Sequence, residues 1–237
     1  MSRQIKGLLY FFVTDLRYSF IIFWSILTAV NIVSLITSYL LLNVTDSFMY
    51  LTNSIATYIY VGILGFITVK ESLPFSLKMG ATRKSYFLSI GTFFVGLSFF
   101  LATLENIYHI VLTSVNKALG IDNFYLFHLA SLVGKGDSLL YRFSIDVFIL
   151  FFGLSSMFLL GLVFHRYGQI GGLGILGVLV ILLLVFAGTG GLMDLIKTII
   201  SNPSFHYFTI IFAIGLVFYG VSWAILHNVS AKSARAS

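Results

Sequence analysis

The sequence contains no cysteine and few charged residues. The absence of Cys from the 237 residues excludes disulfides, thiol nucleophiles and Cys-ligated metal sites. Charged residues make up only 9% of the chain, whereas soluble domains carry roughly 25%. So few charges cannot cover the surface of a water-soluble domain. We therefore expect no soluble enzyme, large sensor domain or nucleotide-binding domain within these residues.

Long apolar segments take the place of that charge. Hydrophobic residues make up 59% of the sequence, and its mean hydropathy is +1.02. A membrane-spanning helix needs about 20 predominantly apolar residues. The segments that meet this length are 18–42, 50–69, 86–112, 143–164, 170–187 and 207–226. We predict an all-α integral membrane protein in which residues 1–237 form a single transmembrane domain with six transmembrane helices.

The basic residues are distributed unevenly over this topology. Six helices place both chain ends on one side of the membrane, together with the 70–85 loop and the 165–169 turn. That side holds ten of the fourteen Lys and Arg residues, namely Arg3, Lys6, Arg17, Lys70, Lys78, Arg83, Lys84, Arg166, Lys232 and Arg235. Because basic residues favour the cytoplasmic side, we predict a multi-pass cell-membrane protein with both termini in the cytoplasm. The net charge of +6 reflects this topology, and we predict no nucleic-acid partner.

Residues 1–17 have the pattern of an amphipathic helix. Apolar residues recur at spacings of three and four, at Ile5, Leu8, Leu9, Phe12, Val13 and Leu16. We predict a helix that lies in the inner membrane interface before the chain turns into the first span. Two roles fit this helix: an anchor in membrane lipid alone, or an anchor that also contacts a cytoplasmic partner.

The 70–85 loop carries the signals of a short cytoplasmic helix. Ser72 and Pro74 are helix-start residues, since Pro is tolerated in a first turn. Gly80 can adopt the left-handed conformation that ends a helix, and Thr82 can cap the next one. The side chains that this helix and its flank would display are Phe75, Lys78, Arg83 and Lys84. Apolar and basic side chains together at such a place favour a protein partner.

A family resemblance is carried by residues 77–87, which read LKMGATRKSYF. This segment resembles the coupling-helix motif of ATP-binding-cassette (ABC) permeases. The plan of an amphipathic N-terminal helix, six spans and a coupling helix between spans 2 and 3 is similar to the ABC type 2 export class. The motif is short, whereas the shared plan covers nearly the whole chain.

The resemblance implies a transport subunit that is not itself an enzyme. Two permease subunits, identical or homologous, would dimerise, and ABC ATP-binding subunits holding ATP and Mg would dock on their coupling helices. The chain has no Gly-x4-Gly-Lys-Ser/Thr phosphate loop, so we expect no cofactor on it. The implied activity is export of a hydrophobic or amphipathic peptide, lipid or drug across a bacterial cell membrane. The residues expected to contact the ATP-binding subunit are Phe75, Leu77, Lys78, Met79, Gly80, Thr82, Arg83 and Lys84.

Small and polar residues recur within the predicted spans. The first span has a polar stripe at Ser25, Thr28, Asn31, Ser34 and Ser38. Such a stripe faces protein or water rather than lipid, so it serves either helix packing or the wall of a translocation pathway. The glycines expected to allow close helix contact are Gly62 and Gly65 in the second span and Gly172 in the fifth. In the related permeases these spans surround the central cavity and the dimer seam.

Ionisable residues in the spans lie close to their outer ends. Glu105 is near the outer end of the third span, and Arg142 and Asp146 begin the fourth, one turn apart. We expect all three at the membrane interface, with Arg142 and Asp146 paired. Glu105 and His109 share a helix face, but two ligands do not make a metal site, and no His-Glu-x2-His motif is present.

Two further functions compete with the permease interpretation. The segment Gly153-Leu154-Ser155 resembles the Gly-x-Ser element of rhomboid intramembrane serine proteases, which also have six spans. A serine nucleophile needs a base within hydrogen-bond reach, and His206 and His227 flank opposite ends of the sixth span, far in depth from Ser155. The other alternative is a non-ABC carrier or an accessory membrane subunit.

Overall fold

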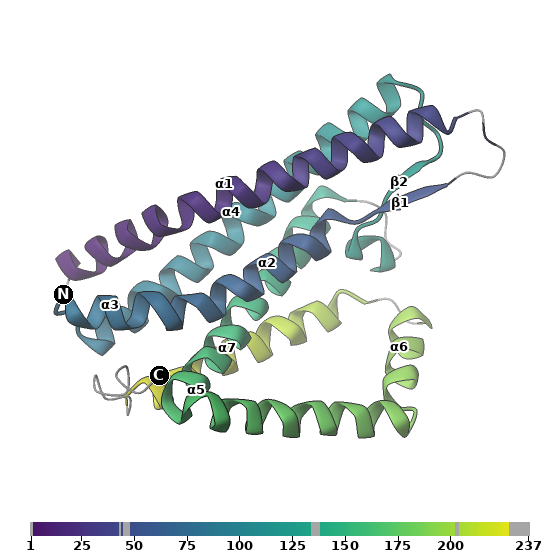
Figure 1. Cartoon of the computed structure of the whole chain (residues 1–237). Helices are drawn as coiled ribbons and strands as arrows, with labels where there is room; N and C mark the ends of the chain where they lie inside the picture. Colours follow the sequence, from purple (N-terminus) through teal and green to yellow (C-terminus); the bar gives the residue numbers. More distant parts are fainter. Residues whose placement is uncertain (1, 43, 45–47, 134–137, 202–203, 228–237) are drawn as a thin grey trace.

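The computed structural model describes residues 2–42, 44, 48–133, 138–201 and 204–227 (Figure 1). Its longer helices are α1 (Ser2–Leu40), α2 (Asn53–Ile67), α4 (Arg83–Ala118), α5 (Leu139–Gly188), α6 (Gly191–Ser201) and α7 (His206–His227). A π-helical turn (Thr68–Ser72) joins α2 to the short helix α3 (Leu73–Lys78). Outside the helical bundle are β1 (Met49–Leu51), β2 (Phe124–Leu126) and a 3-10 helix (Leu129–Val133).

The helices have the length and composition of membrane spans. Within the described residues, five helical stretches are long and apolar enough to cross a membrane. The longest, α5, contains two of the predicted segments, because it bends sharply at Gly168 (Figure 1). Gly168 has φ 72° and ψ −179°, a conformation essentially restricted to glycine. The predicted all-α membrane class is therefore confirmed, and the predicted turn at 165–169 corresponds to the sharp bend at Gly168, where two helical segments of α5 meet.

The N-terminal region differs from the prediction. Residues 2–40 form one continuous helix, with no separate amphipathic element before the first span (Figure 1). No Gly or Pro occurs between Leu8 and Leu40 to break the helix. The amphipathic pattern instead has a packing role, because Leu8 and Phe12 are buried in the hydrophobic core.

A two-stranded parallel sheet joins the loops at the end of the molecule opposite α3 (Figure 1). Met49 pairs with Phe124, and Leu51 pairs with Leu126. The prediction had placed Tyr50 at the start of the second span, whereas the helix α2 begins at Asn53. Three-residue strands are too short to show a period in the sequence, so only the tertiary fold reveals them.

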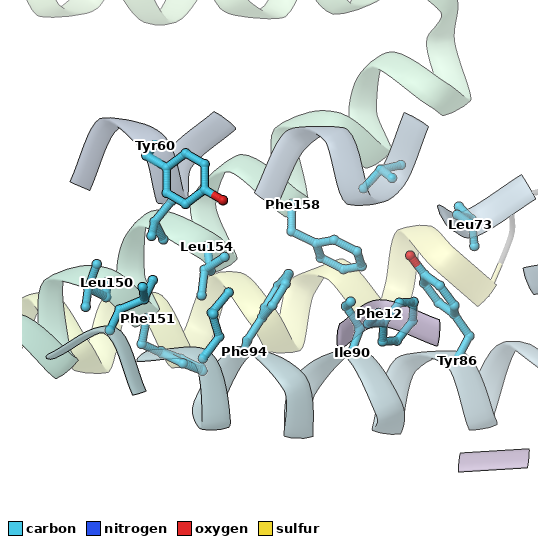
Figure 2. Packing of buried hydrophobic residues seen from close by; sticks show 14 of the residues in the cluster. Phe12, Tyr60, Leu73, Tyr86, Ile90, Phe94, Leu150, Phe151, Leu154 and Phe158 are labelled. Carbon is cyan, nitrogen blue, oxygen red and sulfur yellow. The ribbon is translucent and has the colours of Figure 1, made fainter. Parts of the chain in front are cut away.

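The core forms where α2, α4, α5 and α7 meet. Phe94 of α4 and Phe158 of α5 meet edge to face with ring centroids 5.5 Å apart, and Leu154 packs beside them (Figure 2). The helices α2 and α5 approach closely at glycine. A Cβ atom on Gly65 would lie 2.6 Å from the carbonyl oxygen of Leu154, and one on Gly62 would lie 3.6 Å from Cγ of Met157. The helices therefore approach closely at Gly65, whereas Gly62 has room for a Cβ in ordinary van der Waals contact.

Candidate functional site

The predicted coupling helix is α3, which lies at one end of the bundle. Figure 1 shows α3, the start of α1 and the bend of α5 together at this end. Hydrogen bonds fix the arrangement: Ser85 Oγ donates to Gln4 Oε1 at 3.0 Å, and Arg83 Nη1 donates to the His227 carbonyl at 2.8 Å. The start of α4 is thereby joined to both α1 and the last residue of α7.

The signals at the end of the short helix produce the expected geometry, whereas the predicted start at Ser72 is wrong, because α2 continues through the π-helical turn into α3 and Ser72 has helical φ and ψ with no side-chain cap. Pro74 lies in the first turn of α3, and Leu73 anchors the helix with a fully buried side chain. Gly80 follows with φ 82°, as predicted for the residue after a helix. The Thr82 hydroxyl accepts a hydrogen bond from the backbone N–H of Ser85 at 3.1 Å and so caps α4. A short helix between two fixed points is the result.

Two side chains present apolar surface at this end. Phe75 is 46% exposed and Met79 is 73% exposed. Phe75 also stacks on Phe11 of α1, with ring centroids 4.7 Å apart, so its position is fixed. Lys78 and Lys84 are exposed beside them. These four residues of the predicted contact set are free to meet a partner.

The other predicted contact residues have structural roles. Leu77 is half-buried, and Arg83 is held by the carbonyl of His227. Gly80 makes the turn and Thr82 makes the cap. An open depression beside α3 is lined by residues 77 and 81–84 together with Trp223 and His227 of α7. The α7 residues were missed because they lie far from the loop in sequence and carry no motif.

Positive charge gathers at the same end of the molecule. Lys232 and Arg235, which belong to the predicted basic side, lie outside the described residues. The remaining basic residues of that side are Arg3, Lys6, Arg17, Lys70, Lys78, Arg83, Lys84 and Arg166. Lys78 lies on α3, Lys70, Arg83 and Lys84 lie in the segments that flank it, and Arg3 and Lys6 lie at the start of α1, so this end suits an acidic partner or anionic lipid.

The polar stripe of the first span divides into a packed part and an exposed part. Asn31 donates to Asn53 Oδ1 at 2.9 Å, and Ser38 donates to Asn123 Oδ1 at 2.6 Å. Ser34 is also buried, whereas Ser25 is exposed. Thr28 bonds to the carbonyl of Trp24 within its own helix. The buried members therefore serve helix and loop packing in this chain.

Gly172 packs at the bend of α5 rather than between helices. A Cβ atom there would lie 2.5 Å from the ring of Phe164, which precedes the bend. A cavity of about 180 Å³ lies between α1 and the end of α2, with Asp15 and Glu71 among its lining residues. Its volume is below the roughly 300 Å³ at which drug-sized ligand sites begin.

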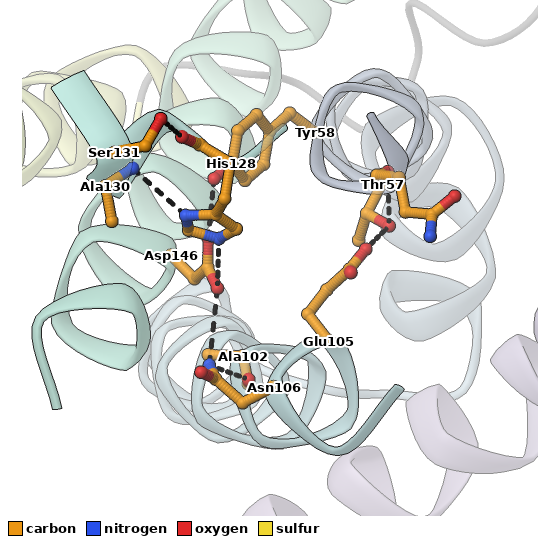
Figure 3. A network of polar contacts seen from close by, with 10 residues as sticks. Thr57, Tyr58, Ala102, Glu105, Asn106, His128, Ala130, Ser131 and Asp146 are labelled. Atoms are coloured by element: carbon orange, nitrogen blue, oxygen red, sulfur yellow. Dashed lines mark hydrogen bonds and ion pairs between the residues drawn. The ribbon is translucent and has the colours of Figure 1, made fainter. Parts of the chain in front are cut away.

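A buried polar cluster occupies the opposite half of the bundle (Figure 3). Asp146 of α5 accepts hydrogen bonds from Tyr58 at 2.5 Å and from His128 at 3.1 Å. Glu105 of α4 is bonded to the hydroxyl of Thr57 on α2. Glu105 and Asp146 are 3% and 0% exposed, because the helices enclose them.

His128 is the member of this cluster that the sequence did not reveal. It lies after β2, where neither a motif nor a helical period distinguishes it. The predicted partner of Asp146 was Arg142, whereas the ring that lies against its carboxylate is that of His128, with Nε2 3.1 Å from Oδ1. Arg142 is buried one turn earlier on α5. The sheet formed by β1 and β2 positions His128 by bringing its loop over the helix ends.

The described residues do not form the metal site or the serine-protease site that the alternative functions would need. Within the described part of the chain, no group of three His, Asp or Glu side chains could hold a metal ion. Ser155 Oγ is buried and finds no hydrogen-bond partner among the described residues, so the base that a serine protease needs is not beside it.

No family model, curated protein or solved structure matches this chain. Its function is therefore inferred from its own sequence and geometry. Two features stand out in the described residues: a fixed basic and apolar protrusion at one end, and a buried carboxylate cluster toward the other.

Proposed function

We propose that the chain is the membrane-spanning permease subunit of an ATP-driven transporter similar to the ABC type 2 exporters. In this proposal it spans the membrane six times with both termini in the cytoplasm, in a bacterial cell membrane. It pairs with a second permease subunit, identical or homologous. Separate subunits that bind ATP and Mg drive alternating access, and the substrate is a hydrophobic or amphipathic peptide, lipid or drug.

The observation that carries the proposal is the attachment of α3. A helix that transmits movement from a partner must be fixed to several spans, since a loose loop would absorb the displacement. The Phe11–Phe75 stack joins α3 to α1, and the Thr82 cap joins its flank to α4. The bond from Arg83 to the His227 carbonyl adds α7.

The exposed side chains of this end are also suited to a protein partner. An exposed Met79 leaves apolar area in water, and its burial against a partner would contribute roughly 25 cal/mol per Å². Lys78 and Lys84 would add complementary charge toward an acidic groove. Lipid alone requires no such fixed helix.

Copurification tests the proposal. The tagged chain, extracted from native membranes in mild detergent, is expected to carry an ATP-hydrolysing subunit identified by mass spectrometry and by ATPase activity. Met79→Glu and Lys78→Glu should reduce that yield at least tenfold, because they place acid against the docking face without removing an internal contact. Gly80→Pro should do the same, since Pro cannot adopt the φ of 82° found there.

Matched controls lie at the other end of the molecule. Lys117 in the last turn of α4 and Leu119 just after it are exposed, so Lys117→Glu and Leu119→Glu should leave the ATPase yield unchanged. An ATPase that remains bound to all the α3 variants would refute the role of α3. A purified chain with no ATPase would instead favour a non-ABC carrier or an accessory subunit.

A further inference from the structure

The two buried carboxyl groups differ in the hydrogen bonds that they receive (Figure 3). Asp146 accepts from three donors: the Tyr58 hydroxyl at 2.5 Å, His128 Nε2 at 3.1 Å and Asn106 Nδ2 at 3.5 Å. An ionised carboxylate accepts hydrogen bonds and donates none. Three donors aimed at one carboxyl group therefore define Asp146 as the ionised member of the cluster.

His128 supplies a donor to this cluster rather than a positive charge. Its Nδ1 accepts the backbone N–H of Ala130 at 3.0 Å, so that nitrogen carries no proton. The ring proton is then on Nε2, which faces Asp146. A histidine with one protonated nitrogen is neutral. The cluster therefore gains no cation from His128.

Among the described residues, Glu105 has a single hydrogen-bond partner, the Thr57 hydroxyl. Thr57 Oγ1 also lies 3.3 Å from the carbonyl oxygen of Asn53. A hydroxyl has one proton and two acceptor positions, so Thr57 cannot donate to both oxygens. Both contacts are satisfied when Glu105 is protonated and donates to Thr57, which in turn donates to Asn53. The ionised form would be a buried carboxylate with one hydrogen bond among the described residues, which is unfavourable for a charged group.

We propose that Glu105 is a proton-binding site that carries its proton at neutral pH and thereby links α4 to α2. The proton is the ligand, and Thr57 is the acceptor that holds it in place. Deprotonation would break the donation to Thr57 and place a second negative charge in the cluster. The linkage between α2 and α4 would then weaken at the end of the bundle opposite α3. This inference does not depend on the permease proposal.

Several ionisable side chains lie on the elements around Glu105. They include Tyr58 on α2, His109 on α4, Asp146 and Arg142 on α5, and His128 in the loop after β2. The part of α1 that follows Arg17 carries no charged side chain. Among the described residues, the hydrogen-bond partner of Glu105 is Thr57.

Infrared spectroscopy of the full chain in lipid nanodiscs tests the proposal. At neutral pH in D₂O the wild type should show the carbonyl band of a protonated carboxylic acid with an area of one of the eight Asp and Glu residues. Glu105→Gln should abolish the band, because the amide replaces the acid while keeping a donor for Thr57. Glu71→Gln, at an exposed carboxylate, should retain it.

The partner residue provides a second readout. Thr57→Val removes the acceptor and should shift the band to higher frequency, whereas Thr57→Ser should keep the wild-type frequency. These variants decide the matter even if Glu105→Gln fails to fold. A wild type without the band at neutral pH, or a band lost in Asp146→Asn and kept in Glu105→Gln, would overturn the assignment.

Discussion

Replacing Gly65 by alanine tests the close packing of α2 against α5. The added Cβ would lie 2.6 Å from the Leu154 carbonyl oxygen and 3.2 Å from the carbonyl carbon and Cα of that residue. These are backbone atoms, so no side-chain rotation relieves the collision and one helix must move. Gly161 restricts that movement, because its own Cβ would lie 3.0 Å from Val69 across the same interface.

Two opposing effects set the change in the free energy of unfolding that Gly65→Ala should cause. Alanine is favoured over glycine by about 1 kcal/mol within a helix, whereas overpacking a tight interior costs about 1–3 kcal/mol. Gly96→Ala on α4 isolates the first effect, because a Cβ there has no neighbour within 4 Å. We expect Gly65→Ala to be less stable than Gly96→Ala by about 1–3 kcal/mol.

The assay is reversible unfolding of the reconstituted chain in mixed micelles with increasing SDS, followed by helical circular dichroism. The free energy of unfolding is compared among the wild type and the two alanine variants. Equal stability of Gly65→Ala and Gly96→Ala would refute the reasoning, since it would mean that α2 and α5 do not approach at Gly65.

Three further predictions use the same unfolding assay or amide exchange. Asp146→Ala should lower the free energy of unfolding by about 1–3 kcal/mol for each buried donor that loses its acceptor. A double-mutant cycle of Asn31→Ala and Asn53→Ala should give a coupling energy of about 0.6 kcal/mol from their reciprocal hydrogen bonds. Thr82→Ala should cost about 1 kcal/mol and speed hydrogen exchange at the Ser85 amide, which loses its cap.

Each of these three predictions has an outcome that would contradict it. An Asp146→Ala chain as stable as the wild type would show that the donors are not buried against that carboxylate. If the two asparagine variants change the free energy of unfolding additively, their side chains do not stabilise the contact between α1 and α2. Thr82→Ser keeps the hydroxyl, so exchange at the Ser85 amide should stay slow, and equal exchange in both variants would exclude the cap.

The short helix and its flanks were predictable because local chemistry decides them. Pro74 in a first turn, Gly80 at positive φ and Thr82 as a cap each act within a few residues. The bend at Gly168 followed similarly from a polar, glycine-containing turn between two apolar segments. The continuous α1 was missed because polar residues near Arg17 do not by themselves break a helix.

Contacts between distant segments could not be predicted in this way. The exposure of the predicted contact residues depends on their neighbours in the fold. Phe75 stacks on Phe11 of α1, and Arg83 bonds to the end of α7. Nothing in the loop sequence indicates either neighbour. The partners of the polar stripe on α1 likewise cannot be predicted from the spacing of its residues. They were decided by the packing of α2 and by the loop that contains Asn123.

The sequence by itself determined the class of protein, because the length and apolar content of its helices are additive properties of the chain. The placement of Lys and Arg predicts which side of the membrane each loop faces. The sequence did not determine the burial of Glu105 and Asp146, since burial depends on the helices and the loop that surround a residue. Only the tertiary structure brought Thr57 to Glu105 and His128 to Asp146, and with them the hydrogen bonds that distinguish an acid from a carboxylate.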